Sequence, residues 1–258
     1  MNLLTNHFFR QLVSRAIRTD YLENLTGFAW LVLQPLLLLA VYAFVFTTIF
    51  KARIPDSGTI GFVPFLAVAF WPWTAFSEGI LRSANAVSAN SALIGKVSFA
   101  SELLPLSTVT ATFLMHMAGY LAVLIVLALI GTPLHGWGVL ASIPILIFMY
   151  LFSAGLALFA SSLQVFVRDI GQILPPLMTF WFFTTPILYS ASLLPESWSR
   201  LMSLNPMTWY VEHLRNFLLF GNYQMGFIDL AVPALSVLVF WTSLVFFRRL
   251  SRHFEDFL

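Results

Sequence analysis

Six long apolar stretches alternate with short polar segments along this chain of 258 residues. The apolar stretches cover residues 28–50, 62–81, 104–130, 139–166, 172–189 and 228–247. Each is long enough for one membrane span, because a helix that crosses the hydrocarbon core of a bilayer needs about 20 mostly apolar residues. Helices also satisfy their own backbone hydrogen bonds, which lipid cannot do. The pattern therefore predicts an all-α integral membrane protein with six transmembrane helices.

The composition agrees with this pattern. The chain is 59% hydrophobic and 9% charged, whereas a soluble domain carries about 25% charged residues. The six stretches contain no Lys or Arg, and their only acidic residues are Glu78 and, at an edge, Asp229. The polar remainder is too small for a soluble domain, so residues 1–258 are predicted to form a single transmembrane domain.

The basic residues predict the orientation of the protein. If the N-terminus is cytoplasmic, nine of the 13 basic residues lie on inside segments and four on outside segments. The inside residues are Arg10, Arg15, Arg18, Arg82, Lys96, Arg168, Arg248, Arg249 and Arg252, and the outside residues are Lys51, Arg53, Arg200 and Arg215. Since cytoplasmic loops carry an excess of Lys and Arg, both termini are predicted to be cytoplasmic.

Residues 5–22 form an amphipathic segment ahead of the first span. Apolar side chains recur with a helical period at Phe8, Phe9, Leu12, Val13, Ala16, Ile17 and Tyr21. The arginines of the segment lie largely off this stripe. The segment is therefore predicted to be a helix that lies flat in the cytoplasmic interface. Two roles stay open for it: a juxtamembrane anchor, or a docking surface for a cytoplasmic partner.

Two inside connections carry charges at informative positions. Glu78 and Arg82 stand at i and i+4, a favourable helical pair, so a structural ion pair is predicted; a proton site at Glu78 is the alternative. Residues 83–103 are predicted to form a short helix across the membrane surface. Arg168 and Asp169 occupy a short turn between the fourth and fifth spans, where they suit a surface contact or a helix-end charge pair.

Residues 190–227 are too apolar for a solvated outer loop and too interrupted for a span. Two short helices that dip into the outer leaflet are predicted. Such re-entrant backbone is tolerated only where protein or a cavity surrounds it, so this segment is expected at the outer mouth of a pathway. Glu212 and Arg215, at i and i+3, are candidates for an ion pair there.

The fifth stretch is dense in aromatic residues, with Phe180–Phe183 in sequence and Tyr189 beyond them. Four consecutive residues point in all directions around a helix, so some of these rings must face protein or a lumen. Sugar rings stack on aromatic rings, which makes a carbohydrate conduit one interpretation and ordinary packing or lipid contact the other. Pro175, Pro176 and Pro186 are predicted to bend or break this helix.

Several kinds of chemistry have no motif in this chain. The string Gly95-Lys96-Val97 lacks the upstream glycine and the hydroxyl residue of a phosphate-binding loop. No nucleophile, metalloprotease or dinucleotide motif appears, and the five histidines are dispersed. We therefore expect no catalytic, metal or cofactor site on this chain. For His116, alone in the third span, a hydrogen bond to a neighbouring helix is favoured over a proton relay.

An ordered set of motifs resembles a known family. It runs through Gly27–Leu36 (GFAWLVLQPL), Trp71-Pro72-Trp73, Asn90–Val97 (NSALIGKV), Val167–Ile170 (VRDI), Thr185–Tyr189 (TPILY), Leu194-Pro195, Asn205-Pro206 and Arg215. Their order and spacing resemble the permease subunit of type 2 ABC exporters, in the branch that exports polysaccharides and polyol phosphates such as O-antigen, capsule and teichoic acid. The resemblance covers essentially the whole chain.

The resemblance implies partners and roles for individual residues. Two permeases and two copies of a separate ABC ATPase would assemble in the bacterial inner membrane, with ATP and Mg on the ATPase and no cofactor on this chain. Contacts that couple to the ATPase would be Arg10, Arg18, Asn90, Leu93, Ile94, Lys96, Arg168 and Asp169. Channel-lining candidates would be Phe28, Trp30, Tyr42, Phe180, Trp181, Phe183 and Tyr189. The outer gate would include Asn205, Pro206, Trp209 and Arg215.

The function predicted is ATP-driven export of a lipid-linked polysaccharide, O-antigen in the first place. An ABC exporter of a drug or lipid is the alternative within the same superfamily. An ion-coupled secondary transporter is a further alternative, for which buried ionisable residues and an internal repeat would be typical. A structural membrane scaffold accounts least well for the aromatic fifth stretch and the apolar outer segment.

Overall fold

The computed structural model describes residues 3–19, 27–51, 60–94, 99–224 and 226–257, and all regular secondary structure in these ranges is helical. The all-α prediction is thereby confirmed. Each predicted apolar stretch coincides with one long helix. These helices are α2 (Gly27–Phe44, continued by a π-helical turn over Val45–Ile49), α3 (Phe62–Ala84), α5 (Leu103–Leu129), α6 (Gly136–Phe166), α7 (Ile170–Thr184) and α10 (Ala231–Leu250, continued by a 3-10 helix over Ser251–Asp256).

Three of these helices are long and apolar enough to cross a membrane. They are α5, α6, and α10 together with its 3-10 continuation. A membrane crossing by α2, α3 and α7, and hence the number of six spans, stays a prediction. The 15 residues of α7 would rise about 22 Å, which is less than the roughly 30 Å hydrocarbon thickness.

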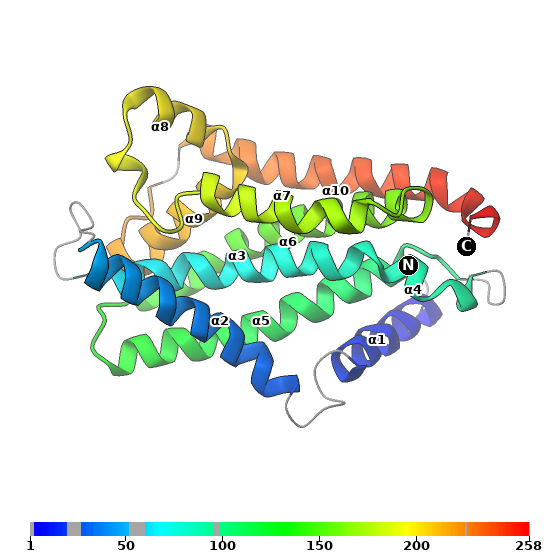
Figure 1. Ribbon diagram of the computed structural model, residues 1–258, viewed down its shortest axis with the longest axis horizontal. Helices are drawn as coiled ribbons and strands as arrows, with labels where there is room; N and C mark the ends of the chain where they lie inside the picture. Colours follow the sequence, from blue (N-terminus) through cyan, green and yellow to red (C-terminus); the bar gives the residue numbers. More distant parts are fainter. Residues whose placement is uncertain (1–2, 20–26, 52–59, 95–98, 225, 258) are drawn as a thin grey trace.

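Helix α3 lies at the centre of the bundle, in contact with α2, α5, α6, α7 and α9 (Pro206–Arg215) (Figure 1). Small residues on its neighbours allow this close packing. A Cβ atom on Gly119 of α5 would come within 2.7 Å of the Trp71 ring. Ser153 of α6 donates a hydrogen bond of 3.2 Å to the carbonyl of Phe76. Gly119 and Ser153 therefore let α5 and α6 pack closely on α3.

Helix α7 differs in its ends from the predicted span over 172–189. It begins at Ile170, runs without a break through Pro175 and Pro176, and ends at Thr184. Thr185 has extended backbone angles (φ −100, ψ 135). The reason is Pro186, because a residue that precedes proline is pushed out of the helical region. The prediction that Pro186 ends the helix is confirmed. At Pro175–Pro176, where a bend or a break was predicted, the helix does not break.

The two ends of the bundle carry different small elements. Both chain termini lie at the right-hand end in Figure 1, close to α1 (Leu3–Ile17) and α4 (Ala86–Ala89). At the opposite end lie α8 (Glu196–Ser203) and α9. The two termini therefore share one side of the bundle, as the charge pattern predicts. The short helices predicted within 190–227 are present as α8 and α9; their entry into the bilayer stays a prediction.

Helix α1 presents its apolar side to the rest of the protein. The rings of Phe8 and Phe99 meet edge to face, with centroids 5.3 Å apart. Leu12 packs with Leu103 and Leu104 at the start of α5. The predicted amphipathic helix is thus present, but protein covers part of the face that was expected to contact lipid. Its orientation in the membrane interface stays a prediction.

Candidate functional site

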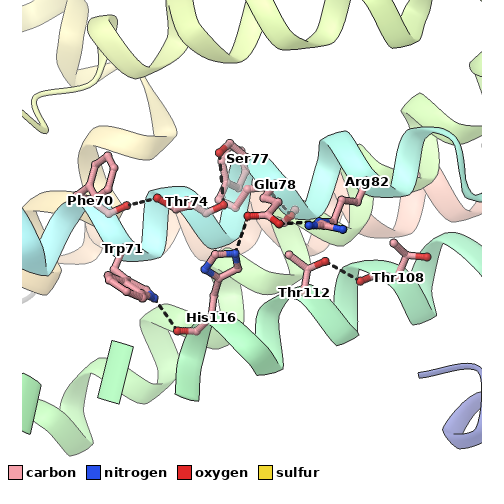
Figure 2. Close-up of polar contacts among 11 residues, drawn as sticks. Phe70, Trp71, Thr74, Ser77, Glu78, Arg82, Thr108, Thr112 and His116 are labelled. Carbon is pink, nitrogen blue, oxygen red and sulfur yellow. Dashed lines mark hydrogen bonds and ion pairs between the residues drawn. The ribbon is translucent and has the colours of Figure 1, made fainter. Parts of the chain in front are cut away.

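A polar cluster links α3 to α5, with His116 buried in the bundle and Arg82 exposed at its surface (Figure 2). Arg82 Nε donates a hydrogen bond of 2.6 Å to Glu78 Oε1, so the ion pair expected from the i,i+4 spacing is present. The other carboxylate oxygen of Glu78 lies 2.8 Å from His116 Nε2 on α5, and the His116 side chain is fully buried. The favoured hydrogen bond from His116 to a neighbouring helix is therefore confirmed.

The backbone around His116 is also tied to α3. Trp71 Nε1 donates to the carbonyl of His116 over 2.9 Å (Figure 2), and Tyr120 donates to the carbonyl of Val68 over 3.0 Å. These hydrogen bonds run between helices that are distant in sequence. The cluster therefore fixes the position of α5 against α3 and supports the structural role predicted for the Glu78–Arg82 pair. The proton site at Glu78 stays an untested alternative. Among the described residues, no group of three His, Asp or Glu side chains lies close enough to hold a metal ion.

The predicted coupling residues that the structure describes belong to α1, to the segment after α4 and to the turn before α7, at the end of the bundle that holds the termini. Arg10 and Arg18 are exposed, and so are Arg168 and Asp169 in the turn before α7. Asn90 donates a hydrogen bond of 2.9 Å to the carbonyl of Ala86 and so closes α4. Leu93 ends the 3-10 helix Ser91–Leu93 and Ile94 follows it; both side chains are half-buried. Lys96 lies outside the described residues.

A groove separates α1 from the segment that follows α4. It has a volume of about 230 Å³ and is lined by Phe8, Gln11, Leu12, Arg15, Leu93 and Phe99. An apolar floor with one exposed arginine at the rim can receive a partner segment. The structure thus brings α1 and the 90–94 segment together, although some 70 residues separate them in the sequence.

The aromatic residues of α7 divide between two faces. Trp181 packs inward among Trp73, Phe76 and Phe152, with ring centroids 5.3 to 6.3 Å away. Phe180 and Phe183 point away from the bundle, with 67% and 55% of their surface exposed. Of the predicted channel-lining aromatics on this helix, Phe180 and Phe183 therefore have the free ring faces that a conduit needs, and Trp181 stabilises the bundle behind them.

The other channel-lining candidates lie near this face. Tyr42 of α2 stacks on Phe182 of α7, with a centroid distance of 5.8 Å, and so joins the first and fifth predicted spans. Tyr189 donates a hydrogen bond of 3.1 Å to the carbonyl of Phe183. The side chains of Phe28 and Trp30 lie outside the described part of the structure. This ring pair joins α2 to α7, and both helices also pack against α3.

Asn205 connects the end of α7 to the start of α9. Its Oδ1 accepts hydrogen bonds from Met207 N at 3.0 Å and from Trp181 Nε1 at 2.8 Å. Its amide nitrogen donates to Thr185 Oγ1 at 2.9 Å. Asparagine is a strongly preferred N-cap, and Pro206 at the first helical position is favourable because it has no N–H to leave unpaired. The Asn205-Pro206 pair therefore fixes where α9 begins.

Trp209 and Arg215, the other predicted gate residues, anchor the two ends of α9 in different ways. Trp209 Nε1 donates to Asp229 Oδ1 over 3.0 Å, and its ring stacks on His213. Sequence reasoning treated Asp229 only as an edge residue of the sixth span. No sequence signal connects these side chains, because 20 residues separate them.

Arg215 is buried, with 3% of its surface exposed. Among the described residues it does not form the expected ion pair with Glu212. Its guanidinium instead donates to the carbonyls of Phe65, Pro186 and Ile187, at 3.1, 2.6 and 2.6 Å. The fork of N–H groups of arginine suits several acceptors at once. The side chain therefore ties α9 to the start of α3 and to the segment after α7.

The Arg215 guanidinium also contacts an aromatic ring, and burial changes its pKa. The guanidinium carbon lies 3.4 Å from the centroid of the Phe65 ring, a cation–π contact. Burial lowers the pKa of Arg215 to about 9, although the charge of Glu212 opposes this shift. The side chain is therefore still protonated at neutral pH, and its charge strengthens the three hydrogen bonds to the carbonyls.

Asn205→Ala is expected to lower the free energy of unfolding by about 1–2 kcal/mol, since it removes an N-cap, and the loss of the Trp181 acceptor adds to this. Thermal unfolding of the purified protein in detergent measures the effect. Asn205→Asp keeps Oδ1 as the acceptor and should lose less stability. Asn222→Ala, at an exposed position where the side chain accepts one hydrogen bond from Gln224 N, is the matched control and should lose less stability. Equal unfolding temperatures for Asn205→Ala and Asn222→Ala would contradict the role of Asn205.

A bundle of long apolar helices of this kind defines a multi-pass membrane protein. Residues 7–219 match the family described as "ABC-2 type transporter", and the chain belongs to this family. It is 28% identical to the O-antigen export system permease protein RfbA of Myxococcus xanthus over 256 residues, which cover 95% of this chain and 93% of that protein.

Two further relatives are similar over most of their length. The RfbA permease of Klebsiella pneumoniae is 25% identical over 249 residues, or 96% of this chain and 93% of that protein. The polysialic acid transport protein KpsM of Escherichia coli is 26% identical over 219 residues, or 83% of this chain and 82% of that protein. The resemblance inferred from the ordered motifs is thereby confirmed.

Proposed function

We propose that this chain is the permease subunit of an ATP-driven exporter that moves a lipid-linked polysaccharide across a bacterial inner membrane. The observation that carries the proposal is the similarity, over nearly the whole chain, to proteins named as O-antigen export permeases. The exposed rings of Phe180 and Phe183 support it, because a carbohydrate chain can slide along aromatic faces. Because these relatives are named as O-antigen export permeases, we propose O-antigen as the substrate.

The proposed transporter contains two copies of this permease and two copies of a separate ABC ATPase, which binds ATP and Mg. All six long helices cross the membrane, and both termini lie in the cytoplasm. Helices α2 and α7 of the two copies face each other and form the conduit, while α8 and α9 form its outer gate. The groove between α1 and residues 90–94 supports an ATPase contact at the end that holds the termini.

The experiment reconstitutes this chain with its partner ATPase in proteoliposomes that contain a lipid-linked polysaccharide. We expect movement of the polysaccharide that depends on ATP and stops with a hydrolysis-deficient ATPase. Movement in the absence of any ATPase would contradict the proposal. If the same preparation transports a drug or a simple lipid but no polysaccharide, the alternative function is correct. The protein is then part of an ABC exporter for a drug or a lipid.

Phe180→Ala combined with Phe183→Ala is expected to reduce the rate of polysaccharide movement about tenfold. Each aromatic contact contributes about 0.5–1.5 kcal/mol, and about 1.4 kcal/mol corresponds to a factor of ten. Phe159→Ala, which also changes an exposed phenylalanine but on α6, is the control and should transport normally. An unchanged rate in the double variant would exclude these rings from the conduit.

A further inference from the structure

Gln164 lies where three elements meet at the end of the bundle that holds the termini. It belongs to the last turn of α6 and is buried, with 8% of its surface exposed. Its Nε2 donates to Asn85 Oδ1 at 3.1 Å and to the carbonyl of Arg168 at 3.1 Å. Its Oε1 accepts a hydrogen bond of 2.6 Å from the backbone N–H of Gly171. One side chain thus joins the end of α3, the turn before α7, and α7 itself.

The contact with α7 fixes the start of that helix. The first four N–H groups of a helix have no partner within it, and Gln164 supplies an acceptor for the one on Gly171, the second residue of α7. A Cβ atom at Gly171 would lie 3.1 Å from Gln164 Nε2, closer than an ordinary contact. The glycine therefore allows the amide to approach the α7 backbone.

The contact with Asn85 reaches the proposed ATPase-coupling segment. Asn85 directly follows α3 and directly precedes α4, and Asn90, Leu93 and Ile94 come a few residues later. Val87 of α4 is fully buried in one cluster with Leu158 and Val165 of α6. Segment 85–94 and the start of α7 are thus both held by the end of α6, and Gln164 is the polar group that bonds to both.

We propose that Gln164 is a positioning residue that transmits displacement of segment 85–94 to α7, which carries the Phe180 and Phe183 rings. This inference rests on the proposed function. A buried amide that loses its partners leaves polar groups unpaired, which is more costly than moving the bonded elements together. Segment 85–94 and the N-terminus of α7 should therefore shift as one unit when the ATPase acts.

The experiment compares variants at the two ends of this link in the assembled transporter. Asn85→Ala removes the acceptor at an exposed position and leaves the bonds of Gln164 to Arg168 and Gly171 intact; Gln164→Leu removes all three bonds. For both variants we expect the amount of polysaccharide moved per ATP hydrolysed to fall about fivefold or more, the change that typical coupling energies produce. The rate of ATP hydrolysis should stay within about twofold of the wild-type rate. Asn85→Asp keeps the acceptor and should restore coupling. Gln172→Leu, on the exposed side of α7, is the control.

A distance measurement separates a transmission role from a purely structural one. The chain contains no cysteine, so spin labels attached to Ala89→Cys and Ile173→Cys react with no other residue of the chain. The distance between the labels should be the same with and without ATP in the wild type and in Asn85→Asp, and should change or broaden with ATP in Asn85→Ala.

Different results would overturn the role of Gln164 and the function of the transporter. Wild-type coupling and an unchanged label distance in both Asn85→Ala and Gln164→Leu would overturn the role of Gln164. A parallel loss of ATP hydrolysis and transport in Asn85→Ala would also overturn it, because that result indicates failed assembly rather than a broken link. A wild-type transporter that moves no polysaccharide would overturn the proposed function itself.

Discussion

Arg215→Met is expected to lower the free energy of unfolding by about 2–5 kcal/mol, because buried acceptors left without a donor cost about 1–3 kcal/mol each. The guanidinium serves three carbonyls in the wild type, and methionine fills a similar volume without any donor. Removal of a buried charge offsets part of the loss, since the charge no longer has to be desolvated. Burial of the carbonyls away from water makes the net effect destabilising.

Thermal unfolding in detergent, followed by circular dichroism, measures this change. Arg200→Met is the matched control, because Arg200 also lies in the outer segment but is exposed and pairs with Glu196 at the surface; its effect should stay within about 1 kcal/mol. Arg215→Lys keeps the charge, but a single ammonium cannot reproduce the planar fork, so an intermediate loss is expected. Equal stability of Arg215→Met and Arg200→Met would show that the three hydrogen bonds contribute nothing.

Gly138→Ala is expected to destabilise the protein by about 1–3 kcal/mol, the usual cost of overpacking a tight contact. A Cβ atom at this position of α6 would overlap with the carbonyl oxygen of Phe217, in the π-helical turn that follows α9. Backbone cannot rotate away as a side chain can, so α6 and the turn must separate. The turn Asn216–Phe220, and α9 before it, then lose close packing against α6.

Gly136→Ala provides a control two residues away on the same helix. A Cβ atom there would meet nothing within 4 Å, and alanine favours a helix over glycine by about 1 kcal/mol. The control should therefore unfold at the same temperature as the wild type or slightly above it. The same unfolding temperature for both variants would contradict the close contact at Gly138.

Local features of the fold followed from the sequence because they depend on neighbours along the chain. The Glu78–Arg82 pair forms at the predicted i,i+4 spacing, and α7 ends before Pro186 for a steric reason that involves adjacent residues. The same local logic was wrong for Arg215, where the i,i+3 acid was expected as the partner. Tertiary packing brought three carbonyls closer, one of them 150 residues away in the sequence.

The candidate site was predictable in its residue types more than in its connections. Aromatic residues on the fifth stretch left a conduit and ordinary packing or lipid contact as two interpretations, because which rings are free depends on how α7 packs on α3 and α6. Trp181 and Phe180 are adjacent in sequence, yet one lies among other rings and the other is exposed. Gln164 gave no signal, because a single amide at the end of an apolar stretch looks like a boundary residue.

The sequence by itself determined that this protein is a helical membrane protein of the ABC-2 exporter type, since apolar length, charge placement and motif order are properties of the chain and its solvent. The tertiary structure alone decided which polar groups meet inside the bundle. His116 reaches Glu78 across 38 residues, and Gln164 reaches Asn85 across 79. Such contacts form because buried polar groups must find partners, and packing decides which partners are within reach.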